Sequence, residues 1–202
     1  MPDTQWLEEL LGPPRDEVVP VPWDRAPAEV GFQFPTLYRQ LIDRYGHISI
    51  NDELHIAGPS QQANQPGAPT GFEGFVYQTT DPHGFCGYLA HCYAEGKSDE
   101  CPYPVYPTAG GILKWANDSE SDHVFWLTGD DDPDRWPVVV VYRSGFEWER
   151  FDGGTADFLR QILTGECDAS EELLGGPLGA NGPAWTVLGD WSGWVSSRDR
   201  KA

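Results

Sequence analysis

Residues 111–151, GILKWANDSESDHVFWLTGDDDPDRWPVVVVYRSGFEWERF, decide the fold because they contain four apolar segments separated by short polar turns. The segments are residues 112–116, 123–127, 136–142 and 146–151. Short runs rich in β-branched and aromatic residues, bounded by Gly, Pro, Asp and Ser, are typical of successive antiparallel strands. The run from Pro137 to Tyr142 is apolar throughout, which favours a central place in the sheet.

Outside this stretch, four segments have the apolar periodicity of helices: residues 4–11, 35–45, 85–94 and 155–164. Thr4 and Thr155 are residue types that cap helix N-termini, and Pro35 suits the first turn of a helix. Gly46 stands where a helix commonly ends on a glycine. We therefore expect helices on both sides of the predicted strands.

The remaining segments complete the expected organisation. Residues 48–50 and 54–56 resemble short strands, residues 13–34 a Pro-rich linker, and residues 57–71 and 97–110 loops. This order predicts an α+β fold in a single domain, an antiparallel sheet of about four to six strands with helices packed around it. We expect the domain to cover residues 1–170, with the Trp/Gly-rich extension 171–202 packed on it or flanking it.

The chain has 202 residues with 32 acidic and 13 basic side chains, a formal net charge of −19. Such a chain is not expected to bind nucleic acid, because that binding depends on Lys and Arg neutralising phosphates. Anionic membrane surfaces should repel it as well, so basic proteins are the expected partners. The absence of a signal peptide or long apolar run predicts a cytoplasmic protein.

Five potential metal ligands lie close together: His83, Cys86, His91, Cys92 and Cys101. Their C-x5-C-x8-C spacing lacks the C-x2-C pair of most structural zinc sites, so buried side chains are the favoured interpretation and no cofactor is expected. Cys86 lies near a predicted helix N-terminus, where a thiol pKa can fall. Together with His123 it leaves open a papain-like cysteine hydrolase, although the pattern is weak.

Seven acidic residues and no basic ones lie between positions 117 and 134. The D-x-D-x-D spacing that starts at Asp130 does not make an EF-hand, since Arg135 stands at the sixth position and Val141 at the twelfth. Two interpretations remain open, solvated turns on either side of one strand or a surface for a basic partner. The residues are Asp118, Glu120, Asp122, Asp130, Asp131, Asp132 and Asp134.

Each of the four predicted strands carries one tryptophan: Trp115, Trp126, Trp136 and Trp148. Packing in the core or on a sheet face is the favoured interpretation, because large aromatic residues dominate protein cores. In the C-terminal extension, Trp191 and Trp194 have polar, Gly-rich neighbours. These two are the better candidates for an aromatic anchor at an interface.

The chain resembles the SMI1/KNR4 (SUKH) superfamily in three places. Residues 34–46, FPTLYRQLIDRYG, match the P-x-x-Y-x-x-L…Y-G helix of the family. Residues 115–118 match its W-A-N-D strand, and Phe125-Trp126 its F-W strand. The closing helix follows in the family order, while the turn 119–122 is longer and more acidic than the family pattern. The resemblance covers about residues 4–165.

This resemblance implies an α+β fold without catalysis. Bacterial members of the family are immunity proteins that bind and neutralise a cognate toxin, often a nuclease, of a polymorphic toxin system. Fungal members are regulatory or scaffold proteins, which is the alternative expectation. We therefore expect a non-catalytic immunity protein that binds a basic toxin through the seven acids, with Trp191 or Trp194 as anchor. The oligomeric state stays open.

Overall fold

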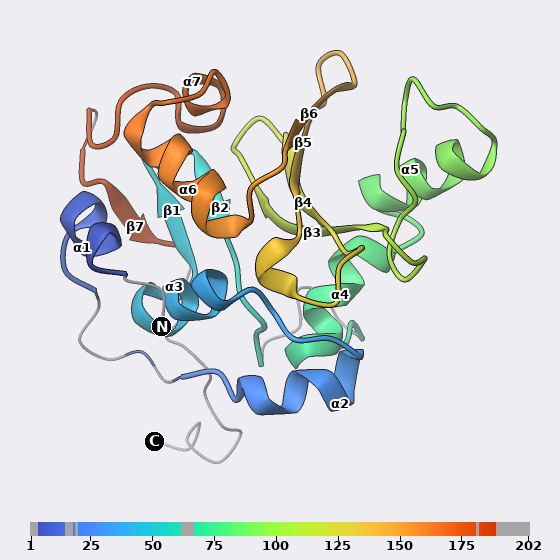
Figure 1. Cartoon of the computed structure of the whole chain (residues 1–202), viewed down its shortest axis with the longest axis horizontal. Helices are drawn as coiled ribbons and strands as arrows, with labels where there is room; N and C mark the ends of the chain where they lie inside the picture. The colour runs from blue at the N-terminus through green and yellow to red at the C-terminus, as the bar shows by residue number, and fades with distance from the viewer. Residues whose placement is uncertain (1–3, 15–17, 19, 62–66, 181, 189–202) are drawn as a thin grey trace.

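A seven-stranded antiparallel sheet, in the order β6-β5-β4-β3-β2-β1-β7, forms the centre of the computed structural model (Figure 1). The structure describes residues 4–14, 18, 20–61, 67–180 and 182–188. Its strands are β1 (Ile48–Ile50), β2 (Leu54–Ile56), β3 (Ile112–Asn117), β4 (His123–Leu127), β5 (Val138–Tyr142), β6 (Glu147–Phe151) and β7 (Trp185–Val187).

Seven α-helices and two short 3-10 helices accompany the sheet in the described residues. The α-helices are α1 (Gln5–Leu11), α2 (Ala26–Val30), α3 (Thr36–Tyr45), α4 (Gly71–Thr80), α5 (Phe85–Ala94), α6 (Thr155–Thr164) and α7 (Ala169–Leu174). The 3-10 helices are η1 (Trp23–Arg25) and η2 (Pro133–Arg135). This is the predicted α+β fold, with one strand more than the upper limit of the prediction. None of the described helices is long and apolar enough to span a bilayer.

Two cores form because side chains alternate across the strands. In β4, Val124 and Trp126 face the larger core, which includes residues of α1, α3, α6 and α7. Phe125 and Leu127 face the smaller core. Helix α5 covers this core with Cys86, Leu89 and Cys92. Figure 1 shows α3 and α6 on one side of the sheet and α5 at the far end of the molecule.

Aromatic stacking fixes the centre of the larger core. Trp115 of β3 and Trp126 of β4 are nearly parallel, with ring centroids 5.3 Å apart and an interplanar angle of 6°. The indole N–H of Trp126 donates to the Thr155 hydroxyl at 3.0 Å. This hydrogen bond explains why Thr155 is not the helix cap that we predicted: Gly154 precedes the first turn of α6, and the Thr155 side chain points into the core instead.

Several predicted boundaries are wrong. The expected linker 13–34 contains η1 and α2, and residues 72–84, for which no element was expected, contain nearly all of α4. The apolar strand β5 is second from the sheet edge rather than central, because β6 lies outside it. It is apolar throughout because helices and loops cover both of its faces: Val138 and Val140 lie in one core, Val139 and Val141 in the other.

The C-terminal part of the described chain continues the domain. After α6 the chain forms α7, and β7 then pairs with β1 through Ser49 and Thr186. Strand β7 is therefore one edge of the sheet and β6 the other.

Candidate partner interface

The seven predicted acids lie in two groups at opposite ends of β4. Residues 118–122 form the turn from β3 into β4, and residues 130–134 follow the other end of the strand. A five-residue strand at about 3.3 Å per residue separates the two groups by roughly 16 Å. They are therefore two separate surfaces rather than one patch.

Asp118 is a structural residue of the first group. Its side chain is 3% exposed, and its carboxylate accepts a hydrogen bond from the backbone N–H of Asp122 at 2.7 Å. Burial raises the pKa of Asp118 above its usual range. The carboxylate of Asp122 accepts in turn from the Arg143 backbone N–H at 2.7 Å. These contacts tie two neighbouring turns together and leave Glu120 as the exposed acid of the loop.

Further acids join this group from elements that are distant in the sequence. A cavity of about 410 Å³ is lined by Glu120 and Asp122, by Glu172 of α7, and by Tyr142, Arg143 and Ser144. The Tyr142 hydroxyl donates to Glu149 at 2.8 Å, and the Arg143 guanidinium lies over the Phe85 ring, 5.1 Å from its centroid. No described ion pair neutralises Glu120 or Glu172, and the three acids of the cavity outnumber its one arginine, so its lining has a net negative charge.

The β1–β2 turn extends the negative surface. The Ser119 hydroxyl donates to the Glu53 carboxylate, and the Thr186 hydroxyl donates to Asp52 at 2.8 Å. The turns β1–β2, β3–β4 and β5–β6 leave the same end of the sheet, beside α7 (Figure 1). We call this surface the acidic hairpin end and define it by Asp52, Glu53, Glu120, Asp122 and Glu172.

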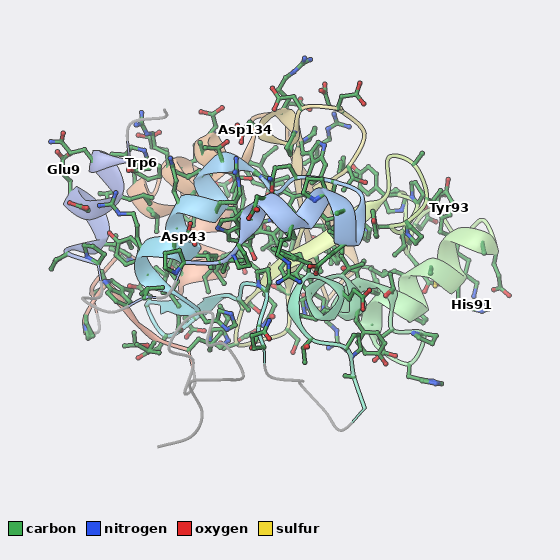
Figure 2. The ribbon with its side chains drawn as sticks, turned by 90° about the horizontal axis from the view of Figure 1, so that it is seen from below. Trp6, Glu9, Asp43, His91, Tyr93 and Asp134 are labelled. Atoms are coloured by element: carbon green, nitrogen blue, oxygen red, sulfur yellow. The ribbon has the colours of Figure 1, made fainter. Side chains whose placement is uncertain are left out.

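In the second group, most carboxylates hold the local structure together. Asp134 accepts two hydrogen bonds from Thr36 at the start of α3, and Figure 2 shows it beside that helix. Asp132 caps η2 by accepting from the Asp134 N–H at 3.1 Å. Asp130 accepts from the Asp132 N–H at 2.9 Å and pairs with Arg135 at 3.1 Å. Among the described residues, Asp131 alone of these acids has no hydrogen bond or ion pair.

A cleft of about 330 Å³ lies next to Asp130 and Asp131, and we call it the acid-rimmed cleft. Phe32 packs against Tyr106 and Trp136, with ring centroids 5.6 and 5.5 Å apart. The Tyr106 hydroxyl donates to the Val30 carbonyl at 2.9 Å. The cleft is lined by Val30, Gly31, Phe32, Gln33, Tyr106, Pro107, Thr108, Ala109, Thr128, Asp130, Asp131, Pro133 and Trp136.

The tryptophans divide as follows. Trp115, Trp126 and Trp136 are buried, which confirms the packing interpretation for them, while Trp148 is half-buried at the smaller core. The predicted anchors Trp191 and Trp194 lie outside the described residues.

The geometry disfavours Cys86 and His123 as a catalytic pair. Burial raises the pKa of the Cys86 thiol to about 11, so the thiol is protonated at neutral pH. Burial lowers the pKa of His123 to about 3, with Lys114 and Arg143 adding to the effect. Its Nδ1 has no hydrogen-bond partner, and its ring packs 4.7 Å from that of Phe85. No hydrogen bond between Cys86 and His123 is seen.

The possible zinc ligands do not come together. Within the described residues, no group of three or more His, Cys, Asp or Glu side chains could hold a metal ion. The Cys92 and Cys101 thiols are buried, and they donate to Glu100 and to the Tyr103 carbonyl. His91 pairs instead with Glu95 on the outer side of α5, where it points away from the body of the protein (Figure 2).

Sequence reasoning missed the residues that complete both surfaces. Glu53 and Glu172 join the acids of the β3–β4 turn from segments that are distant from it in the chain. Phe32 and Tyr106 line the cleft beside Asp131. Only the aromatic character of Phe32 and Tyr106 within Pro/Gly-rich segments could have indicated a role for them.

No protein-family model matches the chain, and no curated protein or solved structure matches it either. The resemblance to the SMI1/KNR4 superfamily therefore stays a prediction.

Proposed function

We propose that this chain is an SMI1/KNR4-like immunity protein that neutralises a basic, nuclease-type toxin by binding it without catalysis. The observation that carries the proposal is the acidic hairpin end, where carboxylates gather from three separate segments of the chain, the β1–β2 turn, the β3–β4 turn and α7. Three of these acids line one cavity together with a single arginine, Arg143. Support also comes from the order of the helix 36–45, the strand pair and the closing helix, which agrees with the family pattern.

The mechanism is electrostatic. A nuclease needs a basic cleft for its phosphate substrate. A surface of complementary charge accelerates the encounter with such a cleft and blocks the access of substrate. The acidic hairpin end is suited to this because its exposed carboxylates stand on hydrogen-bonded turns and on helix α7. Little loop ordering therefore opposes binding.

Only some of the seven predicted acids are free to bind a partner, and Glu172, which was not among them, joins these. Glu120 and Glu172 are exposed and have no described ion pair, whereas Asp118, Asp132 and Asp134 are engaged in hydrogen bonds that maintain the fold. Glu120 and Glu172 can therefore bind a partner without breaking any hydrogen bond of the fold.

Co-expression with a nuclease-type toxin, sought among the products of the genes adjacent to that of this chain, tests the proposal. We expect cells to survive with the wild-type chain and the purified proteins to associate more weakly as salt is added, because salt screens exposed charges. Cell death, together with no association at low salt, would rule out the immunity function. Capture of a host protein in place of the toxin would favour the regulatory alternative.

A further inference from the structure

The acid-rimmed cleft has the composition of a receptor for one long cationic side chain. Phe32, Tyr106 and Trp136 supply aromatic surface, and Asp131 supplies a carboxylate at the rim. Aromatic rings attract cations through their quadrupole, and a planar guanidinium can stack on a ring while it pairs with a carboxylate. We propose that the cleft binds an arginine side chain of the basic partner.

The cleft is held in shape before any ligand arrives. The Trp136 indole N–H donates to the Asp130 carbonyl at 2.6 Å. This hydrogen bond holds the acidic segment at the edge of the cleft against the aromatic side chains that line it. The Tyr106 hydroxyl is held by Val30, and both amide ends of Gln33 are engaged, with the Trp23 carbonyl and the Phe34 N–H. Binding therefore orders few groups on this side of the interface, which favours affinity.

Charge complementarity selects the occupant. Asp131 is exposed and has no described partner, so a cation that enters the cleft gains an ion pair without breaking one. Arg135, whose side chain is 71% exposed, already pairs its guanidinium with the neighbouring Asp130 at 3.1 Å. Asp130 thus already binds a guanidinium within the chain, from the side of a neighbouring cavity that Arg135 lines. An arginine that enters the cleft would compete with Arg135 for this carboxylate.

This inference rests on the proposed function for the identity of the partner, but the chemistry of the cleft can be tested without that partner. The probe is the peptide acetyl-Gly-Arg-Gly-amide, titrated while the Trp136 indole N–H resonance is followed by NMR. The matched peptide with citrulline in place of arginine is nearly isosteric and uncharged. We expect millimolar binding of the arginine peptide and no shift with the citrulline peptide.

Variants separate the cleft from the general negative charge of the protein. Asp131→Asn should raise the Kd about three- to tenfold, the effect of losing one charge-assisted hydrogen bond. Asp99→Asn, an exposed acid without a described partner, changes the net charge equally and should alter the Kd less than about twofold, because distant exposed charges are screened.

A second pair of variants predicts a gain of binding, which a folding defect cannot imitate. Arg135→Ala frees Asp130 and should lower the Kd about threefold, as expected when a competing charge partner is removed. Arg25→Ala removes another exposed arginine, one that pairs with Glu29, and should leave the Kd unchanged.

The cleft proposal is overturned if citrulline shifts Trp136 as arginine does, or if Asp99→Asn weakens binding as much as Asp131→Asn. Absence of any Trp136 shift would overturn it as well. Each of these results leaves the immunity proposal intact, since that depends on the acidic hairpin end. Conversely, a failure to protect cells leaves arginine binding in the cleft unchanged.

Discussion

The carboxylate of Asp134 accepts two hydrogen bonds from Thr36, one from the backbone N–H at 2.5 Å and one from the hydroxyl at 2.6 Å. Thr36 is the first residue of α3, so an acid 98 positions later in the chain binds the free N-terminus of this helix. A carboxylate is favourable there because the first N–H groups have no partner within the helix and the helix dipole is positive. A residue predicted to bind a partner thus fastens η2 to α3.

We expect Asp134→Ala to lower the free energy of unfolding by about 1–2 kcal/mol, the usual effect of losing a helix cap. Asp131→Ala should change it by less than about 0.5 kcal/mol, as at surface positions without partners. Urea denaturation of both variants measures the difference. Equal stabilities would show that the Thr36 contacts contribute nothing.

The close approach of Gly154 to the same segment gives a second test. A Cβ atom at Gly154 would overlap the carbonyl oxygen of Asp134, so Gly154→Ala should destabilise the fold by about 1–3 kcal/mol, as overpacking does. At Gly182 an added Cβ would meet no atom within 4 Å. Thermal unfolding should therefore show a lower melting temperature for Gly154→Ala and an unchanged one for Gly182→Ala. Unchanged stability of Gly154→Ala would contradict the packing of η2 on α6.

Acid should weaken the fold through its buried histidines. Burial lowers the pKa of His123 to about 3 and that of His47 to about 4, whereas both titrate near 6.5 when unfolded. Below pH 6.5 the unfolded chain takes up protons that the folded chain does not, so stability falls as the pH drops from 6.5 to 3. At pH 5 each buried histidine lowers the free energy of unfolding by about 2 kcal/mol.

His123→Gln should therefore reduce the loss of unfolding free energy between pH 7 and pH 5 by about 2 kcal/mol. Asp43 and Asp118 have raised pKa values, mainly through burial, and act in the opposite direction, because the folded form of each takes up a proton first. Denaturant titrations at the two pH values, on the variant and the wild type, measure the difference. An unchanged pH dependence would mean that His123 titrates normally.

Thiol reactivity separates the hydrolase alternative from the proposed binding function. Cys167 is partly exposed, whereas the other three thiols are buried, and the raised pKa of Cys86 further slows its reaction. Alkylation of the native protein should modify Cys167 faster than the other three thiols. The Cys167→Ser variant should therefore lack the fast phase of the alkylation time course. Fast and selective modification of Cys86 would instead indicate an activated nucleophile.

Local patterns predicted the elements that they specify on their own. The strands 48–50, 54–56 and 123–127 were predicted with the bounds that the structure shows, and the helix at 85–94 likewise. Their apolar residues alternate or recur with the right period, and glycines or polar residues bound them. Long-range packing decided the elements that were missed.

Helix α4 is one such element. Its sequence GFEGFVYQTT contains two glycines and several β-branched or aromatic residues, which disfavour helix. The helix forms because Phe72 and Phe75 enter the larger core and the Thr79 hydroxyl accepts from the Lys114 backbone N–H at 2.9 Å. Likewise, no local signal brings Phe32 and Tyr106 to Trp136, so the cleft could be found only in three dimensions.

The most direct test of the proposed function is the association rate with a nuclease-type toxin identified by the co-expression experiment, measured at several salt concentrations. The double variant Glu120→Gln/Glu172→Gln should associate about tenfold more slowly at low salt and show a weaker salt dependence, since steering depends on these charges. The charge-matched Asp24→Asn/Asp99→Asn should behave like the wild type. Equal rates for both double variants, or a wild-type rate independent of salt, would contradict binding through the acidic hairpin end.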